Sequence, residues 1–341
     1  MTLSLTQKLM LLITRISIFI LWLVDIATNT KKIYLVKKLI KISTIVISIL
    51  FISFLIYSFK SQDLAKIADG YFADVFKFTP IQFQAREYPV LLNSGNLPYI
   101  TAKSYLIVDV KNSKILYEHN SSQKLPPAST AKLLTALVTL DIYKMDEVLE
   151  VPEVCTKIDS TKAFLPAKER FSVKDLIYSM LIGSAGDSAC VLALGKLPYE
   201  NFVSLMNRKA SLIGLGNSHF SNPIGLDDEG QNFSTVWDLF TLGKAVMQDP
   251  IISDAVKNKS YEIKSQDGKF FSTLFSTNKL LTEIPNTLGI KTGTTESAGE
   301  VFIYDYADKE KNLIIIVMGS TDRFSDTRAL LSWALRSYSW K

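Results

Sequence analysis

The chain has 341 residues, a net charge of +5 and 48% hydrophobic residues, a composition typical of a protein with a substantial apolar core. The positive charge is local, because the first sixty residues carry eight basic residues and one acidic residue, whereas the remainder carries thirty and thirty-two. A basic excess confined to one end beside apolar segments argues against a nucleic-acid partner. Two cysteines are too few for a disulfide scaffold or a zinc site, so we expect no metal and no cofactor.

Residues 42–59 form an apolar run without a charged residue. As a helix the run would span about 27 Å, close to the hydrocarbon thickness of a bilayer. No small-residue cleavage site follows it, so the sequence predicts an uncleaved transmembrane signal anchor. The lysines before the run place its N-terminal flank in the cytoplasm by the positive-inside rule, and the lipid bilayer is the predicted partner of this segment.

The anchor divides the chain into further predicted regions. Residues 1–41 are expected to be a Lys-rich cytoplasmic region, and residues 60–99, with several prolines and aromatics, an extracytoplasmic linker. Within the first region, residues 9–24 are apolar but interrupted by Arg15, so the sequence leaves open whether they lie on the membrane surface or form a second span. The predicted localisation is the cell membrane, with the long C-terminal part outside.

Regular patterns of apolar residues begin near residue 100. Two strand-like runs around a polar turn predict a hairpin, helical spacing dominates the middle, and strand patterns return before a closing amphipathic helix. The predicted hairpin covers 104–119, the helices fall in 125–141, 172–184, 187–194, 201–215 and 235–247, and the later strands lie at 288–294, 301–306 and 313–320. This order predicts one α/β (α+β) domain over 100–341, with an antiparallel sheet built from both ends and a helical insertion between them.

Ser129 and Lys132 are the first candidate catalytic pair. Three residues apart on a helix, their side chains share one face, so the amine can reach the hydroxyl. A serine is a poor nucleophile unless a base takes its proton, and burial near a helix N-terminus lowers the pKa of a lysine enough to serve. The spacing alone is weak, since Ser121 and Ser276 also have a lysine three residues later. The double proline before this pair and the apolar helix after it favour Ser129.

Two later stretches complete the constellation. Ser184, in "SAGDSA", follows a predicted helix, and "KTGT" lies on a predicted strand, where its members are Lys291, Thr292, Gly293 and Thr294. A lysine there can attract a carboxylate, and a glycine on a strand lets a substrate backbone approach the strand edge closely. Each stretch alone has an ordinary structural explanation, but their order and spacing are specific.

Together, "PPASTAK", "SAGDSA" and "GIKTGTTESAG" resemble the three motifs of the penicillin-binding serine peptidases, and most closely those of the D-alanyl-D-alanine carboxypeptidases of low molecular mass. The resemblance covers residues 102 to about 333. It implies a β-lactamase/penicillin-binding-protein-like domain. It also implies a peptidoglycan stem peptide ending in D-Ala-D-Ala as substrate, and β-lactams as covalent inhibitors.

The resemblance also implies a role for each site residue. Ser129 would attack the carbonyl between the two D-alanines, Lys132 would take its proton, and Ser184 would relay a proton to the leaving amine. Lys291 and Thr292 would hold the terminal carboxylate, next to Gly293 and Thr294. The backbone N–H groups of the nucleophile and of Thr294 would form the oxyanion hole.

One residue departs from the family pattern. Gly186 stands where the second motif usually has an asparagine, whose side chain bridges the catalytic lysine and the substrate backbone. Its loss removes hydrogen bonds worth about 1 to 3 kcal/mol each. The sequence therefore leaves two alternatives open, a DD-transpeptidase and a catalytically weak peptidoglycan-binding protein. It also suggests that Gly186→Asn would leave acylation intact or speed it.

Other hydrolase classes fit less well. A Ser-His-Asp site would have to use His119 or His219, the two histidines of the chain, and both are expected to be structural. A serine β-lactamase would need a segment that supplies a deacylating glutamate, and no E-x-x-L-N pattern is present. Whether Cys155 and Cys190 form a bridge is left open by the sequence.

Overall fold

The structure is a computed structural model, in which the chain divides into two compact units, residues 1–84 and 85–341. The described residues are 15, 18–19, 40–49, 88–92 and 96–340. In the first unit the described residues are helical. No helix among the described residues is long and apolar enough to cross a membrane. Most of the predicted anchor at 42–59 and most of the segment 9–24 lie outside the described residues.

The second unit is organised around a five-stranded antiparallel sheet with the strand order β3-β2-β10-β9-β8. Two strands come from the start of the domain and three from its end, as predicted. The bounds are Ser104–Asp109 for β2, Lys114–His119 for β3, Thr287–Thr295 for β8, Gly299–Ala307 for β9 and Asn312–Ser320 for β10. Because β8 is an edge strand, one of its sides is not paired within the sheet.

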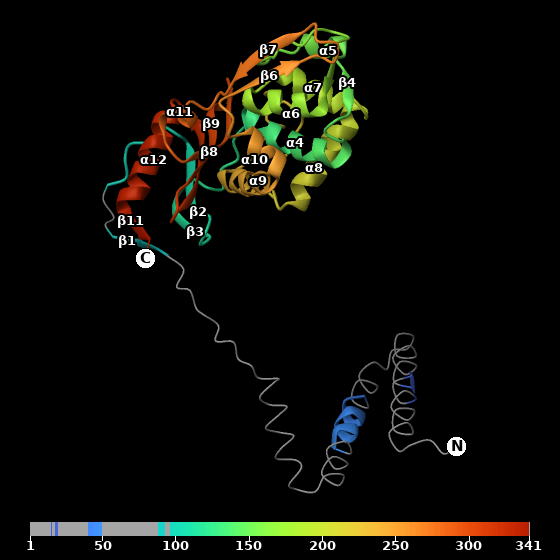
Figure 1. The fold of residues 1–341 in the computed structure, drawn as a ribbon. Coiled ribbons are helices and arrows are strands. Elements are labelled where there is room, and N and C mark those ends of the chain that lie inside the picture. Colours follow the sequence, from blue (N-terminus) through green and yellow to red (C-terminus); the bar gives the residue numbers. More distant parts are fainter. Residues whose placement is uncertain (1–14, 16–17, 20–39, 50–87, 93–95, 341) are drawn as a thin grey trace. The chain divides into compact units, whose positions relative to one another are not determined.

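The sheet is buried on both faces, which explains why its central strand β10 is almost continuously apolar. Successive side chains of a strand point to opposite faces. Leu313, Ile315 and Val317 pack in the core beneath α12 (Arg323–Ser337), whereas Ile314 and Ile316 pack in the core shared with the helical layer. Figure 1 shows α12 on one side of the sheet and the green and yellow helices on the other.

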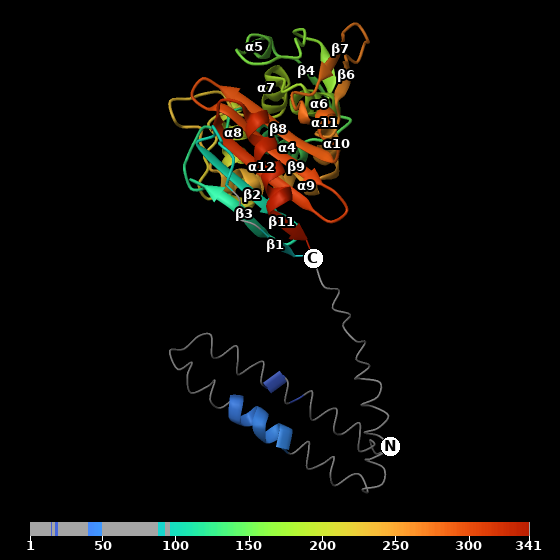
Figure 2. The ribbon, with the colours of Figure 1, turned by 90° about the vertical axis from the view of Figure 1, so that its left-hand side faces the viewer.

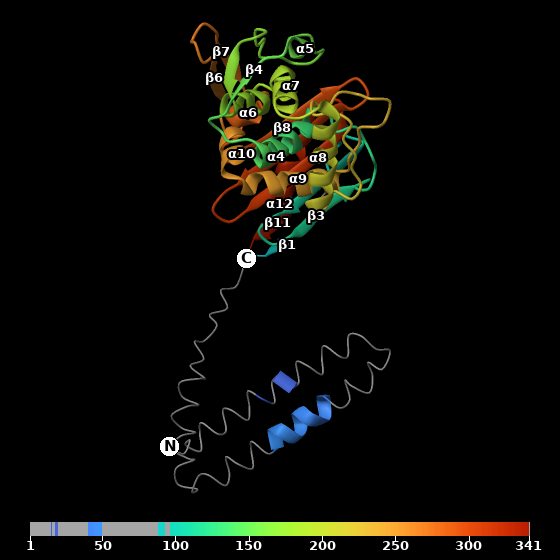
Figure 3. The same cartoon turned by 90° about the vertical axis from the view of Figure 1, so that its right-hand side faces the viewer.

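The helical layer is the predicted insertion between the two groups of strands. In Figure 2 α12 lies in front of the sheet, and in the opposite view of Figure 3 α4, α8 and α9 face the viewer. The longer helices are α4 (Lys132–Ile142), α6 (Val173–Ile182), α7 (Gly186–Leu194), α8 (Tyr199–Leu212), α9 (Val236–Gln248) and α10 (Pro250–Ala255). The short helical turns are η1 (Ala128–Ala131), α5 (Glu153–Thr156) and α11 (Leu280–Glu283).

Local signals account for where several of these helices begin. The Ser172 hydroxyl accepts a hydrogen bond from the backbone N–H of Asp175 at 3.0 Å, the N-cap that the sequence indicates for α6. The double proline before Ser129 leads first into the 3-10 turn η1, and α4 begins at Lys132. The predicted helix over 125–141 is therefore shorter at its start.

Three two-stranded sheets were not predicted, because each strand has only three to five residues. They pair β4 with β5, β6 with β7, and β1 with β11. Their bounds are Val148–Glu150 and Arg170–Ser172, Ser260–Lys264 and Phe271–Phe275, and Pro89–Leu91 and Tyr338–Trp340. Pairing of β1 with β11 places part of the segment predicted as a linker on the folded domain. In Figure 1 the β6–β7 hairpin and the β1–β11 pair lie at opposite ends of this unit.

Candidate active site

Ser129 and Lys132 lie together at the junction of η1 and α4. Lys132 Nζ lies 2.8 Å from Ser129 Oγ and also donates to the carbonyl oxygen of Ile224 at 2.7 Å. The lysine side chain is fully buried, and burial lowers its pKa to about 7, although the Asp187 carboxylate partly opposes this shift. Near neutral pH a substantial fraction of this amine is uncharged, and an uncharged amine can accept the proton of Ser129.

The carbonyl group that contacts Lys132 belongs to a tight turn that the sequence analysis did not single out. The Asn222 side chain holds this turn, because its Oδ1 accepts hydrogen bonds from the backbone N–H groups of Ile224, Gly225 and Leu226 at 3.2, 2.7 and 3.0 Å. An asparagine that binds the backbone just after itself is a common turn-former. The turn thus directs a backbone oxygen at the buried amine.

Ser184 and Lys291 form a second serine–lysine pair. Ser184 has a φ of +59° in the turn between α6 and α7, a conformation that costs a non-glycine residue free energy and often marks a functional site. Lys291 Nζ donates to Ser184 Oγ at 2.8 Å and to the Thr292 carbonyl oxygen at 3.0 Å. Burial, together with the charges of Lys132 and Arg323, lowers the pKa of Lys291 well below its ordinary value.

Gly293 explains how strand β8 reaches the nucleophile. A side chain at residue 293 would place its Cβ 2.8 Å from the backbone nitrogen of Ser129 and 3.2 Å from the carbonyl oxygen of Pro127. Contacts under 3 Å do not occur for real Cβ atoms, so only glycine fits without a backbone shift. The room beside Gly293 is therefore taken by the turn that carries Ser129, whereas the sequence analysis assigned it to an approaching substrate backbone.

The two serine–lysine pairs meet at a cavity of about 600 Å³. Ser129, Ser184, Thr292 and Thr294 line it. Every residue of the predicted constellation thus lies at or beside one cavity, with both lysine side chains buried beneath its wall. The volume suits a ligand the size of a short peptide.

Comparison with known proteins agrees with this arrangement. Residues 92–322 match the sequence profile of the peptidase S11 family, described as D-alanyl-D-alanine carboxypeptidase. The chain belongs to the D-alanyl-D-alanine carboxypeptidase family. Members of this family of serine peptidases are hydrolases, and their penicillin-binding-protein-like fold, an antiparallel sheet packed with helices, is the fold described above.

Individual relatives share both the sequence and the fold. The carboxypeptidase DacC of Escherichia coli is 31% identical over 286 residues, which are 78% of this chain and 68% of DacC. DacF of Bacillus subtilis is 28% identical over 247 residues, 70% of this chain and 63% of DacF. This chain therefore spans about two thirds of the length of these relatives.

Solved structures give the same fold. A penicillin-binding protein homologue from Mycobacterium tuberculosis superposes with a TM-score of 0.67 at 26% identity, covering 72% of this chain and 95% of its own. A single-residue mutant of a Streptomyces DD-transpeptidase superposes with a TM-score of 0.65 at 25% identity, covering 70% of this chain and 99% of its own.

Arg323 is a cavity residue that the sequence analysis missed, at the start of α12. Its guanidinium donates to the Gly293 carbonyl oxygen, to Thr294 Oγ1 at 2.5 Å and to Glu300 Oε1 at 3.1 Å. It therefore joins the third family motif to the neighbouring strand, and it forms an ion pair with Glu300 at the cavity. No sequence motif identifies Arg323, because it lies about thirty residues after "KTGT" and reaches the site through the packing of α12.

The second motif departs from the family at Gly186, and the structure shows what occupies the vacated space. A side chain at residue 186 would place its Cβ 2.7 Å from Ser160 Oγ, 2.9 Å from Ser160 Cβ and 3.2 Å from Ile224 Cγ2. The glycine is thus closely packed, and even an alanine would have to displace a neighbour. The expectation that Gly186→Asn would leave acylation intact or speed it did not take account of this packing.

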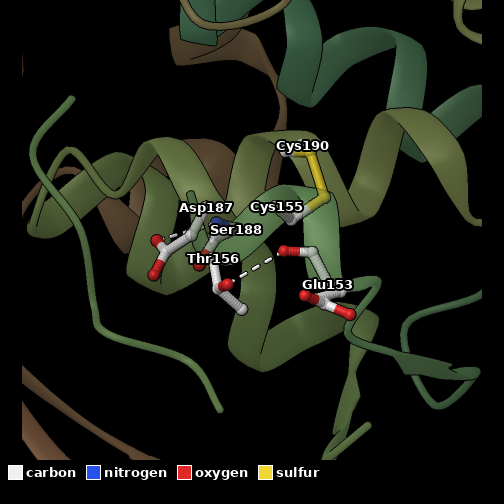
Figure 4. The surroundings of a disulfide bond; sticks show 6 residues. All are labelled: Glu153, Cys155, Thr156, Asp187, Ser188 and Cys190. Carbon is white, nitrogen blue, oxygen red and sulfur yellow. Dashed lines mark hydrogen bonds between the residues drawn. A yellow bond between two sulfur atoms is a disulfide. The ribbon is translucent and has the colours of Figure 1, made fainter. Parts of the chain in front are cut away.

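The loop that carries Ser160 is fastened to α7 at several points. Asp187, which follows Gly186, accepts hydrogen bonds from the backbone N–H groups of Ala163 at 3.0 Å and Leu165 at 3.1 Å. Cys155 and Cys190 form a disulfide between α5 and α7, which settles the pairing that the sequence left open. Figure 4 shows this disulfide, with Asp187 on the same helix as Cys190.

Proposed function

We propose that this chain is a serine-type D-alanyl-D-alanine carboxypeptidase that removes the terminal D-Ala of peptidoglycan stem peptides. The observation that carries the proposal is the Ser129–Lys132 pair, with 2.8 Å between hydroxyl and amine and a buried lysine whose pKa is lowered to about 7. Membership of the D-alanyl-D-alanine carboxypeptidase family supports the same substrate. A nucleophile with an adjacent base in a cavity is the arrangement that acyl transfer requires.

In the proposed acylation, Ser129 Oγ attacks the carbonyl carbon between the two D-alanines while Lys132 Nζ takes the hydroxyl proton. A C–O bond forms to the serine, and the C–N bond to the terminal D-Ala breaks. Ser184, hydrogen-bonded to Lys291, relays a proton to the departing amine. β-Lactams acylate the same serine in this proposal, because their amide carbonyl takes the place of the scissile one.

Substrate binding is assigned to strand β8. The terminal carboxylate favours the protonated form of the Lys291 amine, which in turn attracts the carboxylate. The same amine binds Ser184 Oγ and the Thr292 carbonyl oxygen. The Thr292 and Thr294 side chains line the cavity and bind the carboxylate directly. The backbone N–H groups of Ser129 and Thr294 form the oxyanion hole, in which each donor contributes a few kcal/mol to transition-state stabilisation.

Hydrolysis completes the proposed cycle, when water attacks the acyl carbon and releases Ser129. The alternative acceptor is an amine, which would make the enzyme a DD-transpeptidase, and the structural similarity to the Streptomyces DD-transpeptidase favours keeping this second candidate. A catalytically weak peptidoglycan-binding protein is the third candidate, because Gly186 lacks the usual polar side chain. Transfer of the acyl group to water, its transfer to an amine and a stable acyl-enzyme give different products, so one assay separates the three candidates.

The test is acylation of the full-length protein in detergent by a fluorescent penicillin, combined with D-Ala release from a pentapeptide mimic. We expect labelling of the wild type and D-Ala release over many turnovers, both abolished by Ser129→Ala. Ser121→Ala is a matched control, because Ser121 also has a lysine three residues later but lies outside the cavity. Labelling that survives Ser129→Ala would overturn the assignment, and labelling without D-Ala release would favour binding or transfer.

Membrane anchoring is a separate part of the proposal. Residues 42–59 act as the transmembrane anchor, residues 1–41 lie in the cytoplasm and the peptidase domain at 100–341 lies outside the membrane. Support comes from the uncharged apolar run and the lysines before it. We expect the full chain to stay with membranes after an alkaline carbonate wash and a chain lacking residues 1–59 to be released.

A further inference from the structure

The hydroxyl of Ser160 occupies the space next to Gly186 that a side chain would otherwise fill. A Cβ at residue 186 would lie 2.7 Å from Ser160 Oγ. In an asparagine the two polar side-chain atoms lie about 2.4 Å from Cβ, by standard bond lengths. A polar oxygen from a distant segment therefore stands about as far from the Cβ position at residue 186 as the amide atoms of the usual asparagine would.

This corner adjoins the catalytic lysine. The same Cβ position lies 3.2 Å from Ile224 Cγ2, and the Ile224 carbonyl oxygen accepts the hydrogen bond of Lys132 Nζ at 2.7 Å. Thr161, the residue after Ser160, lines the cavity, and its carbonyl oxygen accepts a hydrogen bond from the Gly186 N–H at 2.7 Å. The space beside Gly186 thus adjoins both Ile224, whose carbonyl group binds Lys132, and the loop that lines the cavity at Thr161.

The position of Ser160 is fixed from both sides in the chain. Before it, Cys155 is tied to α7 by the disulfide with Cys190. After it, Ala163 and Leu165 donate their backbone N–H groups to the buried carboxylate of Asp187. The segment from Cys155 to Leu165 is therefore held on the helix that begins at Gly186, which is the condition for a hydroxyl at a defined place.

The hydroxyl of Ser160 is also available for binding. Among the described residues its side chain makes no hydrogen bond, and the residue is half-buried. A serine hydroxyl can donate one hydrogen bond and accept others. A substrate amide or an ordered water therefore finds both functions there, as it would at the amide of an asparagine.

We propose that Ser160 supplies, from the loop facing α7, the polar group that the second family motif lacks at Gly186. In this role it is a positioning residue, which orients the acyl substrate and the Lys132 amine rather than taking part in bond exchange. In this proposal Gly186 leaves room for a side chain, and Ser160 fills that room with the polar group that an asparagine usually supplies. The inference rests on the proposed acylation of Ser129.

The first test is removal of the hydroxyl in the full-length protein. Ser160→Ala keeps the Cβ and its packing, so we expect an unchanged melting temperature and a fall of about 5- to 100-fold in the second-order rate constant for penicillin acylation, the usual effect of losing one buried hydrogen bond. Thr156→Val is the matched control, because the Thr156 hydroxyl donates to the Glu153 carbonyl oxygen within α5. We expect this control to acylate at the wild-type rate.

The second test exchanges the sizes of the side chains at residues 160 and 186. In the Gly186→Asn single variant the new side chain collides with Ser160, so we expect a lower melting temperature and slow acylation. Ser160→Gly together with Gly186→Asn removes the collision and restores the family side chain, so we expect acylation within a few-fold of wild type. Ser160→Gly alone lacks both polar groups, so a merely structural role for Ser160 predicts that this single variant acylates as fast as the double variant, whereas our proposal predicts that it is slower.

The outcomes separate the two proposals. Wild-type acylation with an equally fast Ser160→Ala variant would overturn the role of Ser160 and leave the proposed function intact. A double variant no faster than Gly186→Asn alone would also overturn it. A wild type that no penicillin acylates would overturn the proposed function and, with it, this inference.

Discussion

Gly225 lies so close to Ala128 that a Cβ at residue 225 would stand 1.9 Å from the Ala128 carbonyl oxygen. Gly225 also has a φ of +84°, which glycine adopts at no steric cost. The turn that carries the Ile224 carbonyl group is therefore pressed directly onto the turn that carries Ser129. The same packing therefore fixes both the carbonyl group that binds Lys132 and the position of Ser129.

Gly225→Ala is expected to abolish most acylation by displacing the Ser129 turn. Gly230→Ala is the matched control, because Gly230 has a φ of +81° but nothing lies within 4 Å of its Cβ position. Both variants bear the cost of a left-handed alanine, about 1 to 2 kcal/mol. Penicillin acylation and thermal unfolding measured on both would show whether the collision or the conformation matters, and equal acylation rates would contradict the prediction.

The pH dependence of acylation follows from the lowered pKa of Lys132. Only the uncharged amine can take the Ser129 proton, so we expect the acylation rate constant to rise with pH through about 7 and then level off. A guanidinium stays charged, so Lys132→Arg should acylate at least about 100-fold more slowly at every pH. Stopped-flow acylation between pH 5.5 and 9 measures both, and a flat wild-type profile would contradict a lysine base.

The same pKa has a consequence for stability. The folded pKa of Lys132 is about 7 and the ordinary value is 10.5, so between these pH values the unfolded chain binds a proton that the folded chain does not. For this group the free energy of unfolding therefore rises with pH over that window. We expect Lys132→Met to flatten the rise in a series of urea unfolding curves, and an unchanged slope would show that other groups cause it.

Arg323 is expected to support substrate binding through strand β8. Arg323→Ala removes the donors to the Gly293 carbonyl oxygen and Thr294 Oγ1, so we expect kcat/KM for D-Ala release to fall roughly 10- to 100-fold, as for loss of hydrogen bonds from a charged group. Arg328→Ala is the control on the same helix, because its partner is Glu283 outside the cavity. Equal kcat/KM values for the two variants would show that the Arg323 contacts are dispensable.

The disulfide is expected to stabilise the folded domain. Cys155 and Cys190 are 35 residues apart, and closing a loop of that length contributes about 3 to 4 kcal/mol to the free energy of unfolding in the chain-entropy description. Reductant should therefore lower the urea midpoint of the wild type. It should leave the midpoint of the Cys155→Ala/Cys190→Ala variant unchanged, and an insensitive wild type would contradict the prediction.

Much of the fold was predictable because its signals are local. The continuous apolar run predicts that β10 is buried on both faces, and Ser172 with Asp175 three residues later predicts the start of α6. The small sheets escaped prediction because three-residue strands such as β4 and β5 are too short to show a period. Their existence depends on partner strands that the chain brings in from elsewhere.

The candidate site divides in the same way. By itself the sequence determined the three motifs, because the reach from Ser129 to Lys132 is one helical turn and needs no other part of the chain. Only the tertiary structure decided which groups surround them, among them the Ile224 carbonyl oxygen on Lys132 and Ser160 beside Gly186. These contacts join segments far apart in sequence, and their geometry is set by how helices and strands pack, which no local pattern encodes.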